Sequence, residues 1–350
     1  MKPDVIGTLL DETVAKRRLP VNLNHDDRAL FEGELQRTIP ATRVLRYSDL
    51  LASADGLLFE GTQILPESFA FPYHLDEWRR RSVMKFFVTN YALRLRRRIE
   101  QETLWITDYW STGYFHWLTD VLTRLFVMRA TLSHARVVLP GKYKAWDHVQ
   151  SCLRAFGATN VDFIRSHEVV KCRSLLMPTH TAPSGHFNHR AIRGVRSLLL
   201  SAYGDARRDE VEDPIDKRIY ISRRSAGRRR IINEDEVTSV LRRFGFETVC
   251  AEELSFEEQV RLFSLARYIV SNHGAGLTNM LFMKQRGNVL ELRHQTDRIN
   301  NCYFTMASAL DLNYFYQTCA PQDPAADPHD AHLLVDLSAL EKNLTLLLQS

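Results

Sequence analysis

The chain has 350 residues, of which 45% are hydrophobic and 25% are charged, and its net charge is +4 at neutral pH. This composition is typical of a folded globular protein and excludes a chain that is disordered throughout. Because single hydrophobic cores stop growing at about 250–300 residues, the length favours two domains. The net charge is too small to indicate nucleic-acid binding by itself.

The cysteines and the N-terminal residues indicate the cellular compartment in which we expect the protein. The five cysteines are widely spaced and no two form a CxxC pair, which favours reduced thiols over a zinc ribbon or a disulfide framework. The first 20 residues carry acidic side chains within a short apolar stretch, unlike a signal peptide. No window reaches the roughly 18 apolar residues that a membrane span needs. We therefore expect a cytoplasmic protein, with peripheral contact at an inner membrane as a second hypothesis.

The N-terminal half begins without a clear hydrophobic period, so residues 1–75 are expected to be irregular with short strands. Residues 78–99 are basic with apolar residues at helical spacing, which predicts an amphipathic helix. Beyond them, predicted strands and helices alternate, with strands at 103–107, 136–139, 161–164 and 174–177 and helices at 114–130 and 146–156. This alternation predicts an α/β domain with a largely parallel sheet. We assign that domain to residues 1–210, of which 1–100 are the irregular part and the basic helix.

The polar segment 204–216 is the predicted linker. After it the alternation resumes, with strands at 218–222, 247–250, 268–271 and 288–292 and helices that begin near Asn233, Ser255 and Leu277. A Glu follows both Asn233 and Ser255 by three residues, which is the pattern of a capping box. These successive βα units predict a Rossmann-like domain at 211–335, followed by an amphipathic C-terminal helix at 336–350.

The sharpest motif is Ser-Asn-His-Gly-Ala-Gly-Leu-Thr-Asn at 271–279, between a predicted strand and a predicted helix. Gly274, Ala275 and Gly276 let the backbone approach a ligand closely. A helix N-terminus offers free N–H groups and a partial positive charge that suit a phosphate, and His273 can add a hydrogen bond. The alternative is a purely structural turn with a capping histidine, because Gly-rich turns are common.

A second motif is the Arg-rich loop 222–230, which follows another predicted strand and contains five arginines. Arg223, Arg224 and Arg229 could each donate paired hydrogen bonds to a phosphate. So many cations repel one another unless an anion or acidic side chains compensate them. A solvated basic loop is one alternative and nucleic-acid binding is another. The latter is weakened because no aromatic side chain is interleaved for base stacking.

Two carboxylates and one histidine complete the set of candidate site residues. Glu291 ends the predicted strand 288–292, where a carboxylate could hold ribose hydroxyls, although a charged strand end is the simpler explanation. His116 and Asp120 share a helix face, and either could be a general base; the alternative is a core histidine held by a carboxylate. The chain contains no D-x-D, HxxxH or HExxH, so we expect no metal and no other cofactor.

Together, residues 218–237, 256–283 and 288–292 resemble glycosyltransferase family 61, and residues 108–125 resemble the N-terminal motif of the same family. The resemblance implies a GT-B-like α/β architecture in which two Rossmann-like domains face a cleft. It implies an inverting, metal-independent transfer from a nucleotide-sugar, for which we predict a UDP-sugar, to a hydroxyl of a glycan or lipid-linked glycan. A soluble bacterial member that acts in surface polysaccharide biosynthesis fits these features.

The resemblance also implies roles for individual residues. Arg223, Arg224 and Arg229 are implied to face the donor phosphates, and Asn233 is implied to cap the helix behind them. The diphosphate is implied to lie against His273, Gly274, Ala275 and Gly276, and the ribose is implied to be held by Glu291. Across the cleft, Asp120 is the first choice for the base and His116 the second. A non-catalytic nucleotide- or glycan-binding module on the same fold is the alternative. Nucleic acid is not an expected partner, and membrane contact through the basic helix 78–98 is a further hypothesis.

Overall fold

The computed structural model describes residues 3–61, 63–80, 94–205 and 216–350. The chain forms two compact units, of which unit 1 comprises residues 1–13 and 39–184 and unit 2 comprises residues 14–38 and 185–350. In the described part of the chain, no helix is both long and apolar enough to cross a membrane.

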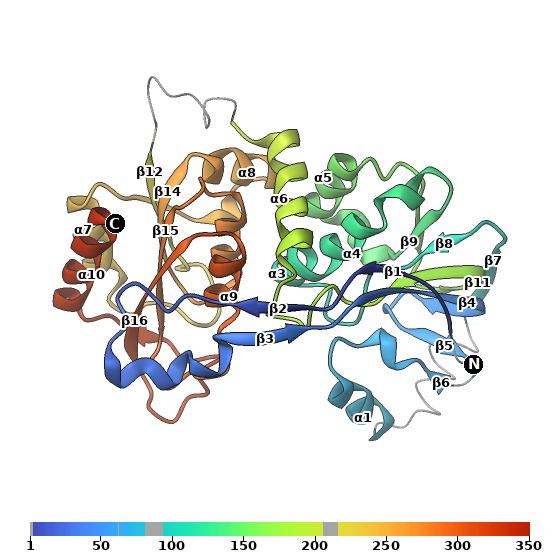
Figure 1. The fold of residues 1–350 in the computed structure, drawn as a ribbon, viewed down its shortest axis with the longest axis horizontal. Helices are drawn as coiled ribbons and strands as arrows, with labels where there is room; N and C mark the ends of the chain where they lie inside the picture. The colour runs from blue at the N-terminus through green and yellow to red at the C-terminus, as the bar shows by residue number, and fades with distance from the viewer. Residues whose placement is uncertain (1–2, 62, 81–93, 206–215) are drawn as a thin grey trace. The chain divides into compact units, whose positions relative to one another are not determined.

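Within the described residues, unit 1 is built on a nine-stranded mixed sheet (Figure 1). The strand order is β10-β9-β8-β11-β4-β5-β6, with β1 beside β4 and β7 beside β11. The strands are β1 (Asp4–Leu10), β4 (Thr42–Ser53), β5 (Leu58–Glu60), β6 (Gln63–Ile64), β7 (Leu95–Ile99), β8 (Thr103–Leu104), β9 (Arg136–Pro140), β10 (Val161–Ile164) and β11 (Glu168–Pro178). The neighbours from β10 to β11 run parallel, whereas β11, β4, β5 and β6 run antiparallel.

Two predictions for this half are wrong. The sheet is mixed instead of largely parallel, because the first 75 residues supply long strands, above all β4, that pair antiparallel. The basic stretch 95–99 is strand β7 instead of a helix, and it pairs with β11. Arg97 in this strand forms an ion pair with Asp162 at 2.5 Å, and Ile99 enters the core. Residues 81–93 of the predicted helix lie outside the described residues.

The predicted helix at 114–130 forms as three successive pieces. These are α3 (Tyr114–His116), a π-helical turn (Trp117–Val121) and α4 (Leu122–Val127). π-helical turns inside helices are frequent at functional sites. The remaining α-helices described in unit 1 are α1 (Pro72–Arg80) and α5 (Asp147–Phe156), and α5 confirms the prediction at 146–156.

Unit 2 contains, within the described residues, a six-stranded sheet in the order β13-β12-β14-β15-β16-β17. The strands are β12 (Lys217–Ile221), β13 (Glu247–Val249), β14 (Ala266–Asn272), β15 (Asn288–His294), β16 (Asn313–Pro321) and β17 (Leu333–Leu334). All neighbours are parallel except β16 and β17. In chain order the parallel strands read 2-1-3-4-5, so the strand order reverses between β12 and β14. The prediction of a Rossmann-like sheet is therefore confirmed for this half.

Helices cover both faces of this sheet (Figure 1). They are α6 (His189–Tyr203), α7 (Glu234–Arg243), α8 (Phe256–Ser264), α9 (Cys302–Ala309), α10 (Leu337–Gln349) and a 3₁₀ helix (Ala275–Phe282). The core on the side of α7 and α10 includes Val270, Leu290, Phe315, Leu340 and Leu344, all fully buried. In unit 2 the apolar faces of these amphipathic helices are therefore buried against both sides of a largely apolar parallel sheet.

The unit boundary differs from the predicted boundary after residue 210. Helix α6 packs on α8 and α9 and so belongs to unit 2, and residues 206–215 of the predicted linker at 204–216 lie outside the described residues. The C-terminal helix α10 packs on β15, β16 and α7. Residues 14–38 also join unit 2: Asn22 donates to the carbonyl of Tyr316 at 2.7 Å and accepts from its N–H at 3.1 Å. The short strands β2 (Thr13–Lys16) and β3 (Gln36–Ile39), which pair with each other, lie where this segment begins and ends.

Of the two predicted capping boxes, one is confirmed. Ser255 accepts a hydrogen bond from the N–H of Glu258, and the Glu258 carboxylate accepts one from the N–H of Ser255. At Asn233 the prediction is wrong, because its side chain forms no cap hydrogen bond. The Asn233 amide instead pairs with the backbone of Val335, donating to its carbonyl at 2.9 Å and accepting from its N–H at 3.0 Å. Asn233 thus ties the start of α7 to a distant segment.

Candidate functional site

Both sequence motifs of unit 2 lie at one edge of its sheet. The Arg-rich loop 222–230 leaves the carboxyl end of β12, and His273 and Gly274 leave the carboxyl end of β14. The two strands are adjacent and pair Ile221 with Ser271 at their ends. This is the point where the strand order reverses, which is where ligands bind in open α/β sheets.

The two loops are in direct contact through Arg223 and Gly274. A Cβ atom at Gly274 would lie 2.2 Å from Nη1 of Arg223, so the guanidinium lies directly against the Gly274 backbone. Gly274 has an extended φ of 168° that any residue adopts, so the neighbouring arginine, and not the backbone, requires glycine here. A Cβ at Gly276 would likewise approach the Ile221 side chain to 2.9 Å.

Arg223 and Arg229 are the half-buried arginines of the Arg-rich loop. Neither forms an ion pair with a carboxylate that the structure describes, whereas Arg228 pairs with Asp330 at 3.0 Å. Burial lowers the pKa of both guanidinium groups, and the charge of Arg229 lowers the pKa of Arg223 further. The Nε atom of each is buried without a hydrogen-bond partner. Half-buried cations that are close together and unpaired indicate a binding site for an anion.

The other residues of the two loops differ in their exposure. Arg224 is exposed and its Nε donates to the Ser222 hydroxyl at 3.4 Å, so it is less constrained than Arg223. Arg229 has a left-handed φ of 54°, and its carbonyl accepts a hydrogen bond from the buried Asn272 side chain. Ala275 is exposed at the start of the 3₁₀ helix, where the first N–H groups of a helix have no partner within the helix.

His273 is held by a buried carboxylate. Its Nδ1 lies 2.5 Å from Oε1 of Glu291, and the Tyr314 hydroxyl donates to the second oxygen of Glu291, also at 2.5 Å. Burial alone would raise the pKa of Glu291, but the charge and hydrogen bond of His273, the charge of Arg293 and the hydrogen bond from Tyr314 together lower it. The Glu291 side chain is 0% exposed. The structure therefore does not support the predicted contact with ribose, and Glu291 instead orients His273.

Tyr303 is a residue of this site that sequence reasoning missed. Its ring lies edge-on to the His273 ring with centroids 4.9 Å apart, and its hydroxyl donates to the Gly274 carbonyl at 2.6 Å. It comes from α9, beyond the recognisable motifs. Tyr303 fixes both the imidazole and the loop against which Arg223 lies.

We expect Gly274→Ala to weaken phosphate binding at this site by about 10–100-fold. The added Cβ must displace the Arg223 guanidinium, and a charge-assisted hydrogen bond contributes about 1.5–3 kcal/mol. Gly227→Ala, in the adjacent Arg-rich loop, is the matched control, because a Cβ at Gly227 meets nothing within 4 Å. Calorimetric titration with UDP measures both variants, and equal affinities would contradict the assigned contact.

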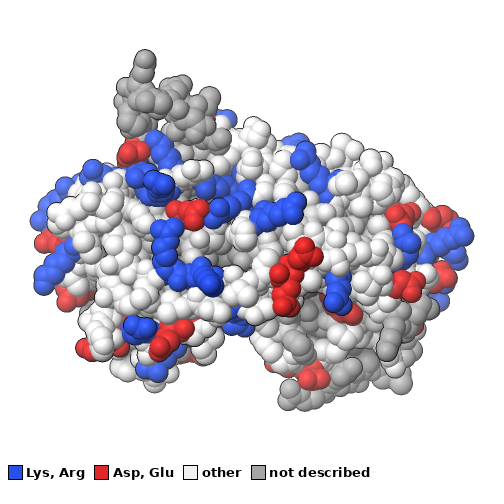
Figure 2. Space-filling model, in the orientation of Figure 1, with Lys and Arg blue, Asp and Glu red and all other residues white. Residues whose placement is uncertain are grey.

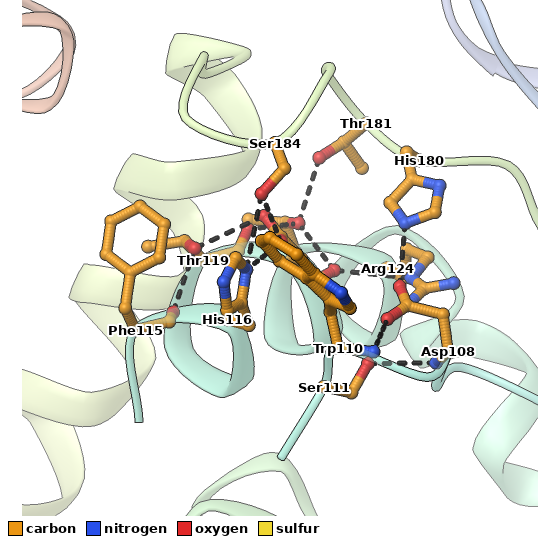
Figure 3. Close-up of polar contacts among 12 residues, drawn as sticks. Asp108, Trp110, Ser111, Phe115, His116, Thr119, Arg124, His180, Thr181 and Ser184 are labelled. Carbon is orange, nitrogen blue, oxygen red and sulfur yellow. Dashed lines mark hydrogen bonds and ion pairs between the residues drawn. The ribbon is translucent and has the colours of Figure 1, made fainter. Parts of the chain in front are cut away.

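In unit 1, the predicted pair His116 and Asp120 is in direct contact. Nδ1 of His116 lies 2.8 Å from Oδ2 of Asp120, which also accepts from the Ser184 hydroxyl at 2.9 Å. Figure 3 shows the side chains of His116 and Ser184. Asp120 lies on the π-helical turn and its side chain is 5% exposed, against 21% for His116. Burial lowers the pKa of His116, but the hydrogen bond and charge of Asp120 outweigh it and the pKa is raised. Because Nδ1–H of His116 donates its hydrogen bond to Asp120, Nε2 of His116 is the ring nitrogen that can accept a proton.

A second buried carboxylate, Asp108, supports this pair. It accepts hydrogen bonds from Arg124 and His180, each at 2.9 Å (Figure 3). Burial alone would raise the pKa of Asp108, but the His180 hydrogen bond and the Arg124 charge hold it well below its usual range. Asp108 also accepts from the N–H of Trp110 at 2.8 Å, and the Trp110 ring lies 5.2 Å from the His116 ring. The charged carboxylate thus positions an aromatic ring beside His116.

Sequence reasoning gave no role to Asp108, Arg124, His180 or Ser184. Asp108 lies in the recognised motif, so its position could have been noticed. His180 and Ser184 lie in the segment after β11 and share no spacing with the motif, so the sequence carries no signal that brings them to Asp108 and Asp120.

Comparison with known proteins identifies the class of this chain. Residues 114–290, about half of the chain, match the family model described as Glycosyltransferase 61. The chain therefore belongs to glycosyltransferase family 61, which confirms the family resemblance that its motifs indicate.

The similar curated proteins are eukaryotic. The EGF domain-specific O-linked N-acetylglucosamine transferase of Mus musculus is 32% identical over 102 residues, which are 28% of this chain and 19% of that protein. The Drosophila melanogaster protein of the same name is 32% identical over 98 residues, or 27% and 18%. A beta-1,2-xylosyltransferase of Oryza sativa subsp. japonica is 25% identical over 209 residues, or 52% and 35%. The chain thus matches about a fifth to a third of the length of these relatives, and its bacterial origin stays a prediction.

Proposed function

We propose that this protein transfers a sugar from a nucleoside diphosphate sugar to a hydroxyl group of an acceptor, and that unit 2 binds the donor. The observation that carries the proposal is that Arg223 and Arg229 are half-buried next to the His273 loop, where the strand order reverses, and form no ion pair with a carboxylate that the structure describes. A diphosphate supplies the missing negative charge. As the bond to the sugar breaks, the leaving diphosphate gains charge, and fixed cations then stabilise it more strongly.

His116 is assigned the part of general base, with Asp120 as the residue that orients it. This reverses the order expected from the sequence, because Asp120 is nearly buried and its Oδ2 accepts from both His116 and Ser184. A carboxylate that holds Nδ1–H leaves Nε2 basic, as in histidine–aspartate pairs of hydrolases. The acceptor hydroxyl loses its proton to Nε2 while its oxygen attacks the anomeric carbon and the diphosphate leaves, so the anomeric configuration inverts.

The names of the relatives suggest the chemistry of the substrates. They describe transfer of N-acetylglucosamine and of xylose. We therefore keep a UDP-sugar as the proposed donor and a glycan hydroxyl as the proposed acceptor. Metal independence is also part of the proposal, and the two arginines support it because they can neutralise the diphosphate without an ion. An arrangement of the two units as a GT-B fold with a cleft stays a prediction.

A thermal-shift screen of nucleotides and nucleotide sugars, with and without EDTA, tests the donor site. Ligand at a hundredfold excess over its dissociation constant stabilises the native state by about 2.7 kcal/mol. We expect a uridine diphosphate to raise the melting temperature equally with and without EDTA, and His273→Ala to abolish the rise. A shift that disappears with EDTA would overturn metal independence. Donor binding without turnover on any glycan would favour a non-catalytic module.

The pH profile of transfer is expected to show an acidic limb centred above about 6.5, the ordinary pKa of histidine. The pKa of His116 is raised by Asp120, and the base works only when unprotonated, so the rate falls as the pH drops through that raised pKa. Asp120→Asn removes the charge that raises the pKa, so the limb of the residual activity should move to lower pH. An unmoved limb would show that a different group titrates.

A further inference from the structure

Unit 2 contains a basic pocket that lies apart from the loops described above. It is a cavity of about 920 Å³. Six basic side chains line it, namely Arg18, Arg193, Arg196, Arg267, Lys284 and Arg286. Among the described residues of its lining, Asp311 is the only acidic one. Lys and Arg side chains are also numerous on the visible face of this unit (Figure 2).

The basic pocket lies at the opposite edge of the sheet from the Arg-rich loop. Arg267 is near the amino end of β14, Lys284 and Arg286 precede β15, and Asn313 begins β16. The Arg-rich loop and His273 lie at the carboxyl ends of β12 and β14. Strand β14 has seven residues, so at about 3.3 Å per residue its two ends are roughly 20 Å apart. A ligand in this pocket is therefore distinct from the donor phosphates.

The charges in the basic pocket are only partly neutralised. Asp311 pairs with Arg193 at 2.7 Å and with Arg18 at 3.7 Å, and Lys284 pairs with Asp216 at 2.9 Å. Neither Arg267 nor Arg286 forms an ion pair with a carboxylate in the part of the chain that the structure describes. Cations that share a concave wall without counter-charges attract anions, and their repulsion is relieved when one binds.

The backbone does not explain an arginine at position 286. Arg286 has a left-handed φ of 56°, where glycine or asparagine is the favoured residue. Arg267, in contrast, donates from Nη1 to the Gln285 carbonyl at 3.0 Å, which holds its guanidinium beside the turn that carries Arg286. Arg267 and Arg286, neither of which pairs with a described carboxylate, thus both line the pocket at the turn that precedes β15.

We propose that the basic pocket binds a multiply charged phosphate group. Five of its six cations are arginines, whose forked donors match phosphate oxygens two at a time. The aromatic residue of the lining, Phe282, is 0% exposed, so the wall offers charge but no ring surface for a nucleobase. A polyphosphate or a phosphorylated head group therefore fits the pocket better than a nucleotide does. The phosphate can belong to a free ligand or to a lipid.

The test is calorimetric titration of the full-length Arg223→Ala/Arg229→Ala protein with sodium tripolyphosphate, so that binding at the other edge of the sheet does not contribute. Adding Arg267→Gln and Arg286→Gly should weaken binding by about tenfold or more. Glycine is well suited to the left-handed turn, so this variant should fold, and a thermal melt verifies that it does. The matched control removes two exposed arginines of unit 1 through Arg43→Gln and Arg129→Gln and should bind as the parent does.

Equal affinity in the pocket variant and the control, or no binding by the parent, would overturn the proposal. The same titration on the unmodified protein saturated with UDP gives a second measurement that does not depend on the arginine substitutions. Sedimentation with phosphatidylcholine vesicles, with and without phosphatidic acid, distinguishes a lipid phosphate from a free phosphate ligand. Vesicle binding that is lost in the pocket variant assigns a lipid phosphate, and tripolyphosphate binding without vesicle binding assigns a free one. Both of these outcomes support the pocket.

Discussion

His116→Ala is expected to lower the turnover number of transfer by about 10²–10⁴-fold while the affinity for the nucleotide stays unchanged. The imidazole is the proposed base, and its Nδ1 is fixed 2.8 Å from Asp120, so that Nε2 can take the acceptor proton. Single-turnover transfer from the nucleotide sugar selected in the thermal-shift screen gives the rate, and calorimetry with UDP gives the affinity. Because no residue of unit 2 changes, a loss of UDP affinity is not expected.

His134→Ala is the matched control for this substitution. His134 is also in unit 1, its side chain is 58% exposed, and it lies outside the hydrogen bonds around Asp120. It should keep the turnover number of the parent. If His116→Ala kept full turnover while Asp120→Asn abolished it, the carboxylate would be the base, as the sequence first suggested. A decrease of similar size in both variants is the expected result, because Asp120 sets the tautomer and the pKa of His116.

The sequence predicted the second half of the fold well, because its signals are local. Alternating strand and helix patterns predict parallel βα units, and all parallel strands of unit 2 except β16 lie where the pattern placed them. That residues 14–38 pack as part of unit 2 could not be predicted from the sequence. Asn22 and Tyr316 are 294 residues apart in the chain, and no local pattern indicates such a pairing. In unit 1 the same difficulty applies to β4, whose partner β11 lies more than a hundred residues later.

Individual residues of the candidate site could be predicted from the sequence, but the contacts between them could not. The sequence identified Arg223, Arg229 and His273, and the sheet order brings them to one edge. For Glu291 the structure favours a role other than the predicted ribose contact, because the strand was expected to end at 292 whereas β15 continues to His294. Glu291 therefore lies inside the sheet instead of at its rim. A strand end defined by hydrophobic residues alone misses polar residues that are buried by pairing with each other.

Glu291→Ala is expected to lower the free energy of unfolding by about 3–5 kcal/mol and to weaken UDP binding. The substitution removes a fully buried carboxylate and leaves His273, Tyr314 and the buried Arg293 without its charge or its hydrogen bonds. Chemical denaturation measures the stability. Tyr314→Phe is the control, since it removes one of the two hydrogen bonds but keeps His273 on the carboxylate, so it should lose less stability and keep UDP affinity.

Glu291→Gln separates the orienting role of this residue from a contact with ribose. If the carboxylate held the ribose hydroxyls, the variant would lose its discrimination between UDP and 2′-deoxy-UDP. The structure predicts the opposite result: the ratio of the two affinities stays that of the parent, and both affinities fall together because His273 loses its charged partner. This outcome is expected because the Glu291 side chain is fully buried and both its oxygens accept hydrogen bonds from the protein. Glu291 then acts on the donor only through His273, and any group that binds the ribose has to come from elsewhere in the protein.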